Sequence, residues 1–354
     1  MIYLLIRNMK EVFDMGKYNL PKIDLHLHLD GSILPETAWE LVQKQGIEVP
    51  AKDYESFVPL IMVPEDCKDV NECLERFEIP VKILQDKASL TRVTQELIGW
   101  LEEEGVAYAE IRFAPQLHTQ KGLTQRDAID AVLEGKEIGL REHPQVGIGI
   151  ILCAMSIGPE TVNMEENLET VRLTKEYLGK GVVALDLAGA EGIVPLSNFA
   201  PIFDLARELG LPFTCHAGDS QGPETVEDAL NFGAKRLGHG HHVYEDPALC
   251  QRAIEEGATF EICPTSNVCC QSTMSYGDHY VKKMYDLGMR VTINTDNMTL
   301  FGLTLDKEYD HCIYDMGFTE DDLLQMLLYS AEAAFLGEAE KAALKERILA
   351  CRNK

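Results

Sequence analysis

Four histidines and one aspartate in this chain have the residue types and the spacing that a metal centre needs. His26 and His28 lie two residues apart in the first apolar run of the sequence. Because alternate residues of a β-strand face the same side, both imidazoles are expected to point the same way. His216, His239 and Asp296 each stand at the end of a later apolar run. Any one of them alone is compatible with a structural role, such as a helix cap for Asp296, but together they predict a shared site.

The chemistry that such a set favours is the activation of water by zinc. Three imidazoles and one carboxylate around an open coordination position suit Zn²⁺, although another divalent transition metal could use the same ligands. Zinc lowers the pKa of its bound water to about 7, which makes hydroxide available near neutral pH. Two-metal barrel hydrolases need a bridging group after the fourth strand, and the run 182–189 ends without a lysine. We therefore expect one metal ion.

The elements that must position these residues alternate between strands and helices. Short apolar or β-branched runs bounded by Gly, Pro or polar residues are typical of buried parallel strands. They lie at 23–29, 107–114, 146–155, 182–189, 212–218, 236–240, 259–266 and 290–296. Helical apolar spacing is found between them, for example at 90–105, 124–143 and 201–210. The pattern predicts an α/β fold, a (β/α)8 TIM barrel with its functional side chains at the strand ends. An open doubly wound sheet is the competing fold, but no GxGxxG turn follows the first strand.

The chain is expected to form a single domain over 1–354, with a short N-terminal extension at 1–20. The first connection, about 34–90, is unusually long and predicts a helical insertion that could cover the barrel mouth. Linkers, repeats and low-complexity segments are not evident in the sequence.

Composition and charge exclude several classes of protein. The chain has 354 residues, 45% hydrophobic and 25% charged, which is the balance of a globular protein with a large core. Its net charge of −26 argues against nucleic acid as a partner and leaves a small, uncharged substrate acceptable. The N-terminal MIYLLIR is too short for a signal segment or a membrane span, so we expect a cytoplasmic protein. Its ten scattered cysteines are expected to be buried free thiols. The sequence does not predict an oligomeric state.

Five segments together resemble one family of enzymes. They are HLHLDGS at 26–32, CHAGD at 215–219, RLGHGHH at 236–242, CPTSN at 263–267 and INTDN at 293–297. In order and spacing they are similar to the adenosine deaminase family, the metal-dependent adenosine and AMP deaminase-like hydrolases of the amidohydrolase superfamily. The resemblance extends from about residue 20 to 340 and includes EIRFAPQLH at 110–118 and LAGAE at 187–191.

The resemblance implies a role for each residue of the predicted metal site. His26, His28, His216 and Asp296 match the zinc ligands of the family. Asp296 would also accept a hydrogen bond from the attacking hydroxide, and His239 would orient that hydroxide.

The resemblance also implies the contacts with a purine substrate. Asp30, beside His28, matches the residue that holds the ribose 5′-hydroxyl, and the Gly189 backbone would face a ring nitrogen. Leu74 and Phe77 align with a hydrophobic lid. Structural alternatives stay open, because Gly189 could serve only a tight turn, Asp30 could only cap a helix, and the two apolar residues could only pack a helix.

Two positions depart from the family pattern. The family motif HAGE is HAGD here, so Asp219 replaces the glutamate that protonates ring nitrogen 1. Its carboxyl group is one methylene shorter, and a misplacement of about 1 Å can cost about a hundredfold in rate. Asn297 stands where many members have a second aspartate, and its neutral amide can donate a hydrogen bond to ring nitrogen 7.

The resemblance predicts hydrolytic deamination of adenosine or 2′-deoxyadenosine to the inosine product and ammonia, a reaction of purine salvage. A carboxylate at Asp30 favours a nucleoside because a 5′-phosphate would meet like-charge repulsion. One alternative is another 6-aminopurine as substrate, such as adenine, an N6-substituted purine or a modified nucleoside. The other is a purine-nucleoside-binding protein whose catalysis is weakened by Asp219.

Overall fold

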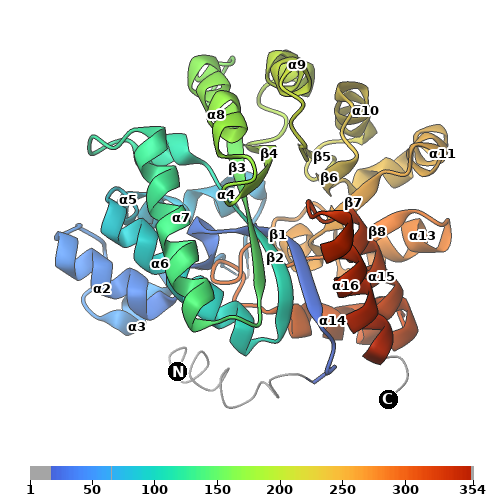
Figure 1. The fold of residues 1–354 in the computed structure, drawn as a ribbon, viewed down its shortest axis with the longest axis horizontal. Helices are drawn as coiled ribbons and strands as arrows, with labels where there is room; N and C mark the ends of the chain where they lie inside the picture. Colours follow the sequence, from blue (N-terminus) through green and yellow to red (C-terminus); the bar gives the residue numbers. More distant parts are fainter. Residues whose placement is uncertain (1–16, 65, 352–354) are drawn as a thin grey trace.

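Eight parallel strands surround a common centre in the computed structural model, which describes residues 17–64 and 66–351 (Figure 1). They are β1 (Lys22–His28), β2 (Val106–Phe113), β3 (Gly147–Ser156), β4 (Val182–Gly189), β5 (His216–Ala217), β6 (Arg236–His239), β7 (Thr259–Ile262) and β8 (Arg290–Ile293). Strands β1 to β4 form one parallel sheet in sequence order, and β5 to β8 form another. Single parallel bridges, Leu185 with Phe213 and Leu27 with Asp296, join the two sheets into a ring. The predicted TIM barrel is confirmed.

All eight predicted strands are present, but some are shorter than the apolar runs that predicted them. β5 contains two residues, and the segment before it pairs with β4 at Leu185, which exchanges backbone hydrogen bonds with Pro212 and Thr214. β7 ends at Ile262 because Pro264 begins a helix two residues later.

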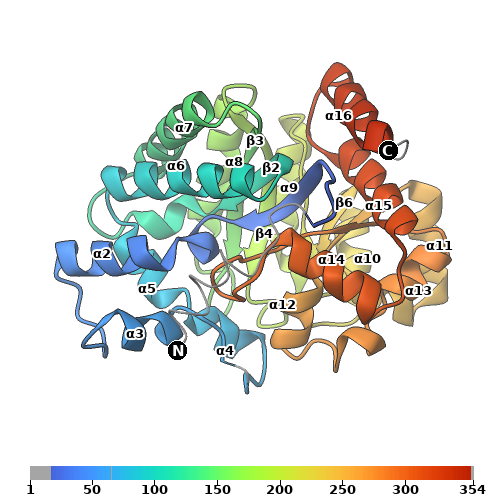
Figure 2. The same cartoon turned by 90° about the horizontal axis from the view of Figure 1, so that it is seen from below.

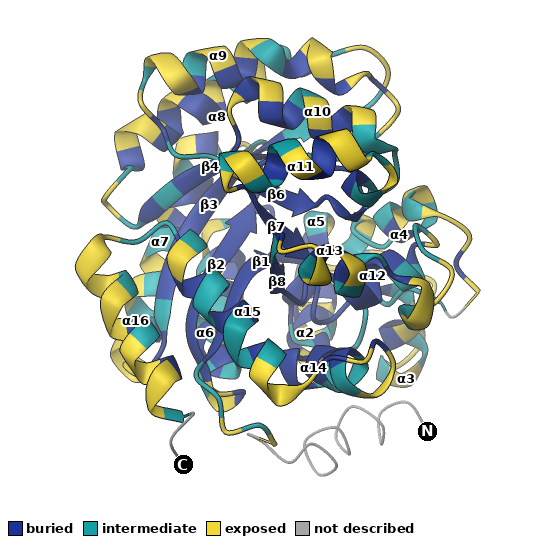
Figure 3. Ribbon diagram, turned by 90° about the vertical axis from the view of Figure 1, so that its right-hand side faces the viewer, coloured by how far each residue is buried: buried dark blue, intermediate teal, exposed yellow. Residues whose placement is uncertain are grey.

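Helices cover the outside of the barrel, and their outer faces are exposed while the strands are buried (Figure 3). After β2 they are α7 (Gln125–Glu142), α8 (Met164–Tyr177), α9 (Ala200–Glu208), α10 (Pro223–Phe232), α11 (Pro247–Glu256), α12 (Pro264–Cys269), α13 (Val281–Asp286), α14 (Leu305–Tyr314), α15 (Glu320–Ala333) and α16 (Glu338–Cys351). Short 3-10 turns are η1 (Asp30–Ser32), η2 (Val58–Leu60), η3 (Pro115–His118), η4 (Leu196–Phe199), η5 (His241–Glu245) and η6 (Tyr276–Asp278). The three helices predicted from apolar spacing are confirmed as α6, α7 and α9.

The long connection between β1 and β2 is helical, as predicted. It contains α2 (Pro35–Gln45), α3 (Tyr54–Phe57), α4 (Val70–Glu75), α5 (Glu78–Ile83) and then α6 (Lys87–Glu103). α6 begins earlier than its apolar pattern because the Asp86 side chain accepts the Ser89 N–H and caps the helix. α2 to α5 lie together on one side of the barrel, where α4 comes beside α12 (Figure 2).

Residues 1–16 of the predicted N-terminal extension, including MIYLLIR, lie outside the described residues. Among the described helices, none combines the length and the apolar character that crossing a bilayer would require. All ten cysteines fall within the described residues and are free, and all but Cys269 and Cys351 are buried, as predicted.

Buried charges connect the strands inside the barrel. Arg112 on β2 lies 2.8 Å from Asp186 on β4 and 2.7 Å from Glu261 on β7. Arg236 on β6 binds Glu261 and Glu110. Charges buried in this way need full pairing, and here each guanidinium contacts two carboxylates. The network fixes Asp186 and Glu261 directly beneath the predicted metal site.

Candidate active site

The predicted metal ligands come together at one end of the barrel. The ring centres of His26 and His216 are 4.6 Å apart, and each lies 5.4 Å from the ring of His28. One nitrogen from each of the three rings lies within 4.8 Å of the others. Asp296 Oδ1 lies 3.5 Å from His26 Nε2 and 3.4 Å from His28 Nε2. The three imidazoles therefore form one cluster, and the Asp296 carboxylate lies beside two of them.

Backbone contacts between β1 and the end of β8 set this geometry. His28 N–H donates to the Asp296 carbonyl, and Asp296 N–H donates to the His26 carbonyl, at 2.7 and 2.8 Å. Asp296 has φ +60°, a left-handed conformation that a non-glycine residue adopts at a cost. Gly238 leaves the room for the rings, since a Cβ there would lie 2.9 Å from His26 Cε1. The strain and the missing side chain both serve the histidine cluster.

Two buried carboxylates orient the imidazoles. Glu261 Oε2 lies 2.9 Å from His26 Nδ1, and Asp186 Oδ2 lies 3.0 Å from His216 Nδ1. His26 Nε2 is buried and has no hydrogen-bond partner among the described residues. A metal-binding histidine commonly donates its other N–H to a carboxylate, so this arrangement fits a metal at the Nε2 side. Asp186 and Glu261 are not among the residues predicted from the sequence, although an acid inside an apolar strand signals a buried partner.

Burial lowers the pKa of two of the three clustered histidines, His26 and His28, which favours the neutral rings that bind metals. At His216 the Asp186 carboxylate acts against burial and raises the pKa. Burial alone would raise the pKa of Asp296, but the neighbouring imidazoles hold it well below its usual range. Cys263 lies in a second group with His26, His239 and Asp296, but burial raises its pKa well above the ordinary value. A buried thiol is a poorer ligand than the imidazoles and the carboxylate.

Asp219 and His239 lie together beside the histidine cluster. The His239 ring centre is 4.8 Å from that of His26, and its Nδ1 lies 3.6 Å from Asp219 Oδ1. Asn267 Nδ2 donates to Asp219 Oδ1 at 2.6 Å and lies 3.2 Å from His239 Nδ1. Ser272 Oγ also donates to Asp219 Oδ1, at 3.3 Å. Asn267, in the CPTSN motif, was not assigned a role from the sequence.

Glu191 holds the backbone that carries Asp219. Its carboxylate accepts the N–H groups of Gly218, Asp219, Ser220 and Gln221 at 2.6 to 3.1 Å. It also accepts the Thr225 hydroxyl at 2.7 Å. The loop after β4 thereby holds the loop after β5. The sequence gives one sign of this role: Glu191 is the last residue of the LAGAE motif at 187–191.

Comparison with known proteins is consistent with this geometry. The family model for adenosine deaminase matches residues 21–351. The chain belongs to the adenosine deaminase family. An adenosine deaminase of Haemophilus ducreyi is 40% identical over 340 residues, which cover 95% of this chain and 97% of that protein.

Solved structures share the fold of this adenosine deaminase family member. An adenine deaminase from Arthrobacter aurescens superposes with a TM-score of 0.85 at 24% identity, covering 95% of this chain and 100% of that one. An amidohydrolase from Burkholderia ambifaria, solved with bound zinc, gives a TM-score of 0.84 at 23% identity and coverages of 94% and 92%. The chain is thus an enzyme with the family's barrel fold.

The residues predicted to contact substrate lie around this centre. Asp30, on η1, is 5% exposed, and its Oδ1 has no hydrogen-bond partner among the described residues. Burial raises the pKa of Asp30 to about 6. Asn297 packs against Gly31, where a Cβ would lie 1.7 Å from Asn297 Oδ1. Asn297 follows Asp296 in the chain, so η1 lies beside the segment that carries Asp296.

Gly189 ends β4 next to a cavity of about 270 Å³ that also reaches His216 and Glu191. Its φ is +106°, and a Cβ there would lie 2.5 Å from the Ser156 carbonyl. Glycine is therefore required by the backbone, which is the structural alternative considered for this position. Its contact with a purine ring stays a prediction.

The predicted lid residues belong to the helical insertion of this family member. Leu74 lies on α4, and Phe77 precedes α5; both are half-buried. α5 contacts η1, which carries Asp30. The insertion is therefore next to the site, and the closing of these two side chains over a substrate stays a prediction.

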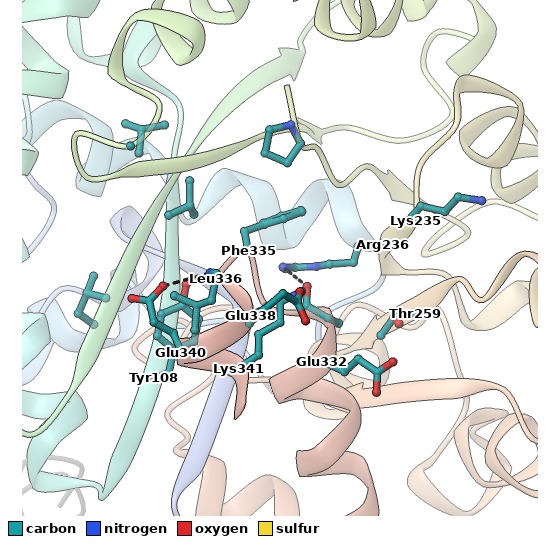
Figure 4. A pocket seen from close by; sticks show the side chains of 18 of the residues that line it. Tyr108, Lys235, Arg236, Thr259, Glu332, Phe335, Leu336, Glu338, Glu340 and Lys341 are labelled. Carbon is teal, nitrogen blue, oxygen red and sulfur yellow. Dashed lines mark hydrogen bonds and ion pairs between the residues drawn. The ribbon is translucent and has the colours of Figure 1, made fainter. Parts of the chain in front are cut away.

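A larger cavity, about 940 Å³, lies at the opposite end of the barrel (Figure 4). It is lined by Arg236 and Thr259, the first residues of β6 and β7, and by Glu332, which pairs with Arg290. None of the predicted site residues lines it. Its position at the amino-terminal ends of the strands separates it from the deaminase centre.

Proposed function

We propose that this enzyme deaminates adenosine and 2′-deoxyadenosine by hydrolysis, as a step of purine salvage that uses one zinc ion. The observation that carries the proposal is the cluster of three imidazoles, from His26, His28 and His216, with the Asp296 carboxylate 3.4 to 3.5 Å from two of them. The carboxyl group of Asp219 lies beside this cluster, through His239 and Asn267. A hydrolytic deamination needs both parts, a water to add and an acid to protonate the ring.

The four ligand residues would hold zinc, which when bound supplies a water with a pKa of about 7. Asp296 and His239 would hold the attacking water by hydrogen bonds on the side that faces carbon 6 of the purine. Glu261 and Asp186 keep the imidazoles in place through their Nδ1 atoms.

Asp219 would donate its proton to ring nitrogen 1 as the water oxygen adds to carbon 6. The carbon–nitrogen bond to the amino group then breaks and carbon 6 becomes a carbonyl. One proton of the water leaves with the amino group as ammonia, and the other returns to Asp219, while ring nitrogen 1 keeps the proton it received. Asn267 and Ser272 hold Oδ1, whereas Oδ2 receives no hydrogen bond from the described residues. The second oxygen is therefore the one available to the purine.

Asp30 would select a nucleoside over a nucleotide. Its buried, unpartnered Oδ1 can accept a hydrogen bond from a ribose 5′-hydroxyl, while a phosphate at that position would be repelled. In Asp30→Asn we expect the preference for adenosine over 5′-AMP, measured as the ratio of kcat/KM, to fall. An unchanged ratio would contradict the assignment of Asp30 to the 5′-hydroxyl.

We also propose that the enzyme is cytoplasmic, with a purine nucleoside as its partner. Its ten free cysteines support this location, because free thiols suit a reducing environment.

The test is ammonia release by the purified, zinc-loaded enzyme. Adenosine, 2′-deoxyadenosine, adenine and 5′-AMP are compared at equal concentration, and the two nucleosides are expected to react fastest. Faster turnover of adenine, or of an N6-substituted purine added to the comparison, would show that the substrate is not adenosine. The proposed hydrolytic deamination would still stand. Tight nucleoside binding with zinc present and no ammonia would indicate a binding protein instead.

A further inference from the structure

Three cysteines meet beside the active site without a role in the proposed reaction. Cys67 and Cys73 belong to the helical insertion, and Cys270 follows α12. All three are buried and pack with the partly buried side chains of Val63, Val70 and Phe301 in a cluster of their own. The insertion and the barrel therefore meet at thiol groups.

Cys73 is influenced by both of the other thiols. Cys73 Sγ is 3.3 Å from Cys67 Sγ, and the Cys270 thiol is the largest influence on the pKa of Cys73. Among the described residues, no metal-binding group contains all three sulfurs within 4.8 Å of one another. The three thiols therefore lack the closed arrangement in which thiolates surround a metal ion. The contact between Cys67 and Cys73 suits a reaction between two neighbouring sulfurs.

We propose that Cys67 and Cys73 form an oxidation site, which a peroxide converts into a disulfide. The Cys73 sulfur attacks a peroxide oxygen, the oxygen–oxygen bond breaks, and Cys73 becomes a sulfenic acid as water (an alcohol for an alkyl peroxide) leaves. The Cys67 sulfur then attacks the Cys73 sulfur, the sulfur–oxygen bond breaks, and water leaves. The two thiols lose two electrons, which reduce the peroxide.

The surroundings of Cys73 suit the attacking role. The neighbouring Cys270 and Cys67 thiols lower the pKa of Cys73 against the opposing effect of burial, with Cys270 the larger cause. Burial raises the pKa of Cys67 to about 12, so this sulfur keeps its proton while Cys73 reacts. The 3.3 Å between the two sulfurs leaves only a short movement to a disulfide bond, near 2.05 Å.

The disulfide would act on the active site from two directions. Leu74, a predicted lid residue, follows Cys73 on α4. Cys270 lies two residues before Ser272, whose hydroxyl donates to Asp219. A disulfide that moves Cys73 would change its packing against Cys270, and with it the contact between the insertion and the segment that holds Asp219. We expect ammonia release to fall several-fold on oxidation and to recover with dithiothreitol.

The test treats the full, zinc-loaded enzyme with increasing hydrogen peroxide, blocks the remaining thiols and maps the cysteine peptides by mass spectrometry. A Cys67–Cys73 link that dithiothreitol reverses is expected. A Cys73–Cys270 link, oxidation confined to other cysteines, or alkylation of Cys67 and Cys73 as thiols after treatment would overturn the proposal. This mapping needs no substrate, so it stands even if the proposed deamination fails.

Single variants separate the two roles. In Cys67→Ser, Cys73 is expected to stop at the sulfenic acid, which a dimedone probe traps. In Cys73→Ser, the link and the peroxide sensitivity should both disappear while activity before treatment remains. Cys351→Ser is the matched control and should form the link as the parent enzyme does. A sulfenic acid trapped by dimedone at Cys67 instead of Cys73 would overturn the order of attack. If a variant does not fold, the mass-spectrometric map of the parent enzyme still decides which cysteines pair.

Discussion

Asp219 has a side chain one methylene shorter than the glutamate of the HAGE motif, and two hydrogen-bond donors hold its carboxyl group in place. Asn267 holds Oδ1 at 2.6 Å, and Ser272 adds a second donor at 3.3 Å. A side chain fixed by two donors is pre-organised, and a pre-organised acid transfers its proton without first reorienting.

We expect Asp219→Asn to reduce kcat with adenosine by about 10²- to 10⁴-fold. The amide keeps nearly the same shape as the carboxyl group but has no acidic proton to donate. Steady-state ammonia release measures the loss, and binding of inosine should change little. Asp228→Asn removes another carboxyl group that lines the small cavity and should leave kcat near that of the parent enzyme. Full activity in Asp219→Asn would show that another group protonates the ring.

At the scale of elements, the site depends on contacts between loops that follow different strands. Glu191, after β4, accepts four successive backbone N–H groups of the loop after β5. A carboxylate offers enough lone pairs for this, whereas an amide offers one oxygen and turns an NH₂ group toward the donors.

We therefore expect Glu191→Gln to lower kcat by about 10- to 100-fold through misplacement of Asp219, with a smaller change in KM. The free energy of unfolding should fall by about 1–3 kcal/mol, because backbone donors lose their partner. Kinetics and urea unfolding measure the two effects. Glu227→Gln, on the exposed face of α10, is the control, and equal behaviour of the two variants would contradict this positioning role.

Helix α14 contributes a buried acid, Glu308, that links folding to pH. Its Oε1 accepts the Thr265 N–H at 3.0 Å, its Oε2 has no partner among the described residues, and burial raises its pKa from 4.5 to about 8. Between these values the folded chain holds a proton that the unfolded chain has released. The contribution of Glu308 to stability is therefore full at low pH and is lost as pH rises through this window.

In Glu308→Gln the Tm should decline less between pH 5 and 8 than in the parent enzyme, since the amide does not titrate. Thermal unfolding at several pH values in this range checks it. The exposed Glu346→Gln should follow the parent curve. Parallel curves for the parent and Glu308→Gln would mean that Glu308 is ionised in the folded enzyme.

At the scale of the whole molecule, the proposed metal site takes its residues from both four-stranded sheets. His26 and His28 come from β1, His216 begins β5, and Asp296 follows β8. An ion bound to all four would bridge both sheets where only single backbone bridges close the ring. Any ligand that binds only the folded state stabilises it, by about 2.7 kcal/mol at a hundred times its Kd.

Removal of the metal with a chelator is therefore expected to lower the Tm, and added zinc should restore it. His28→Ala should have the lower Tm from the start and respond little to the chelator. His311→Ala, which alters a surface histidine beside Asp315, should respond as the parent enzyme does. A Tm unaffected by chelation, with metal loss measured, would contradict the bridging role.

The sequence by itself determined the barrel and its catalytic end. Eight apolar runs predict eight parallel strands because the spacing of apolar residues and the length of each run are local properties of the sequence. The histidines at the ends of these runs predict a shared metal site because all parallel strands of a barrel end on the same side. The spacing of His26 and His28 on one strand is local in the same way.

Only the tertiary structure decided which residues support that site. Glu191, Asn267 and Glu261 lie far along the chain from the groups they hold, so no local pattern pairs them with Asp219 or His26. The short β5 and the contact between Cys67 and Cys73 likewise depend on how neighbouring segments pack in the folded chain. Hydrogen bonds and thiol contacts form at about 3 Å between segments that only the closed barrel brings together, which sequence spacing does not encode.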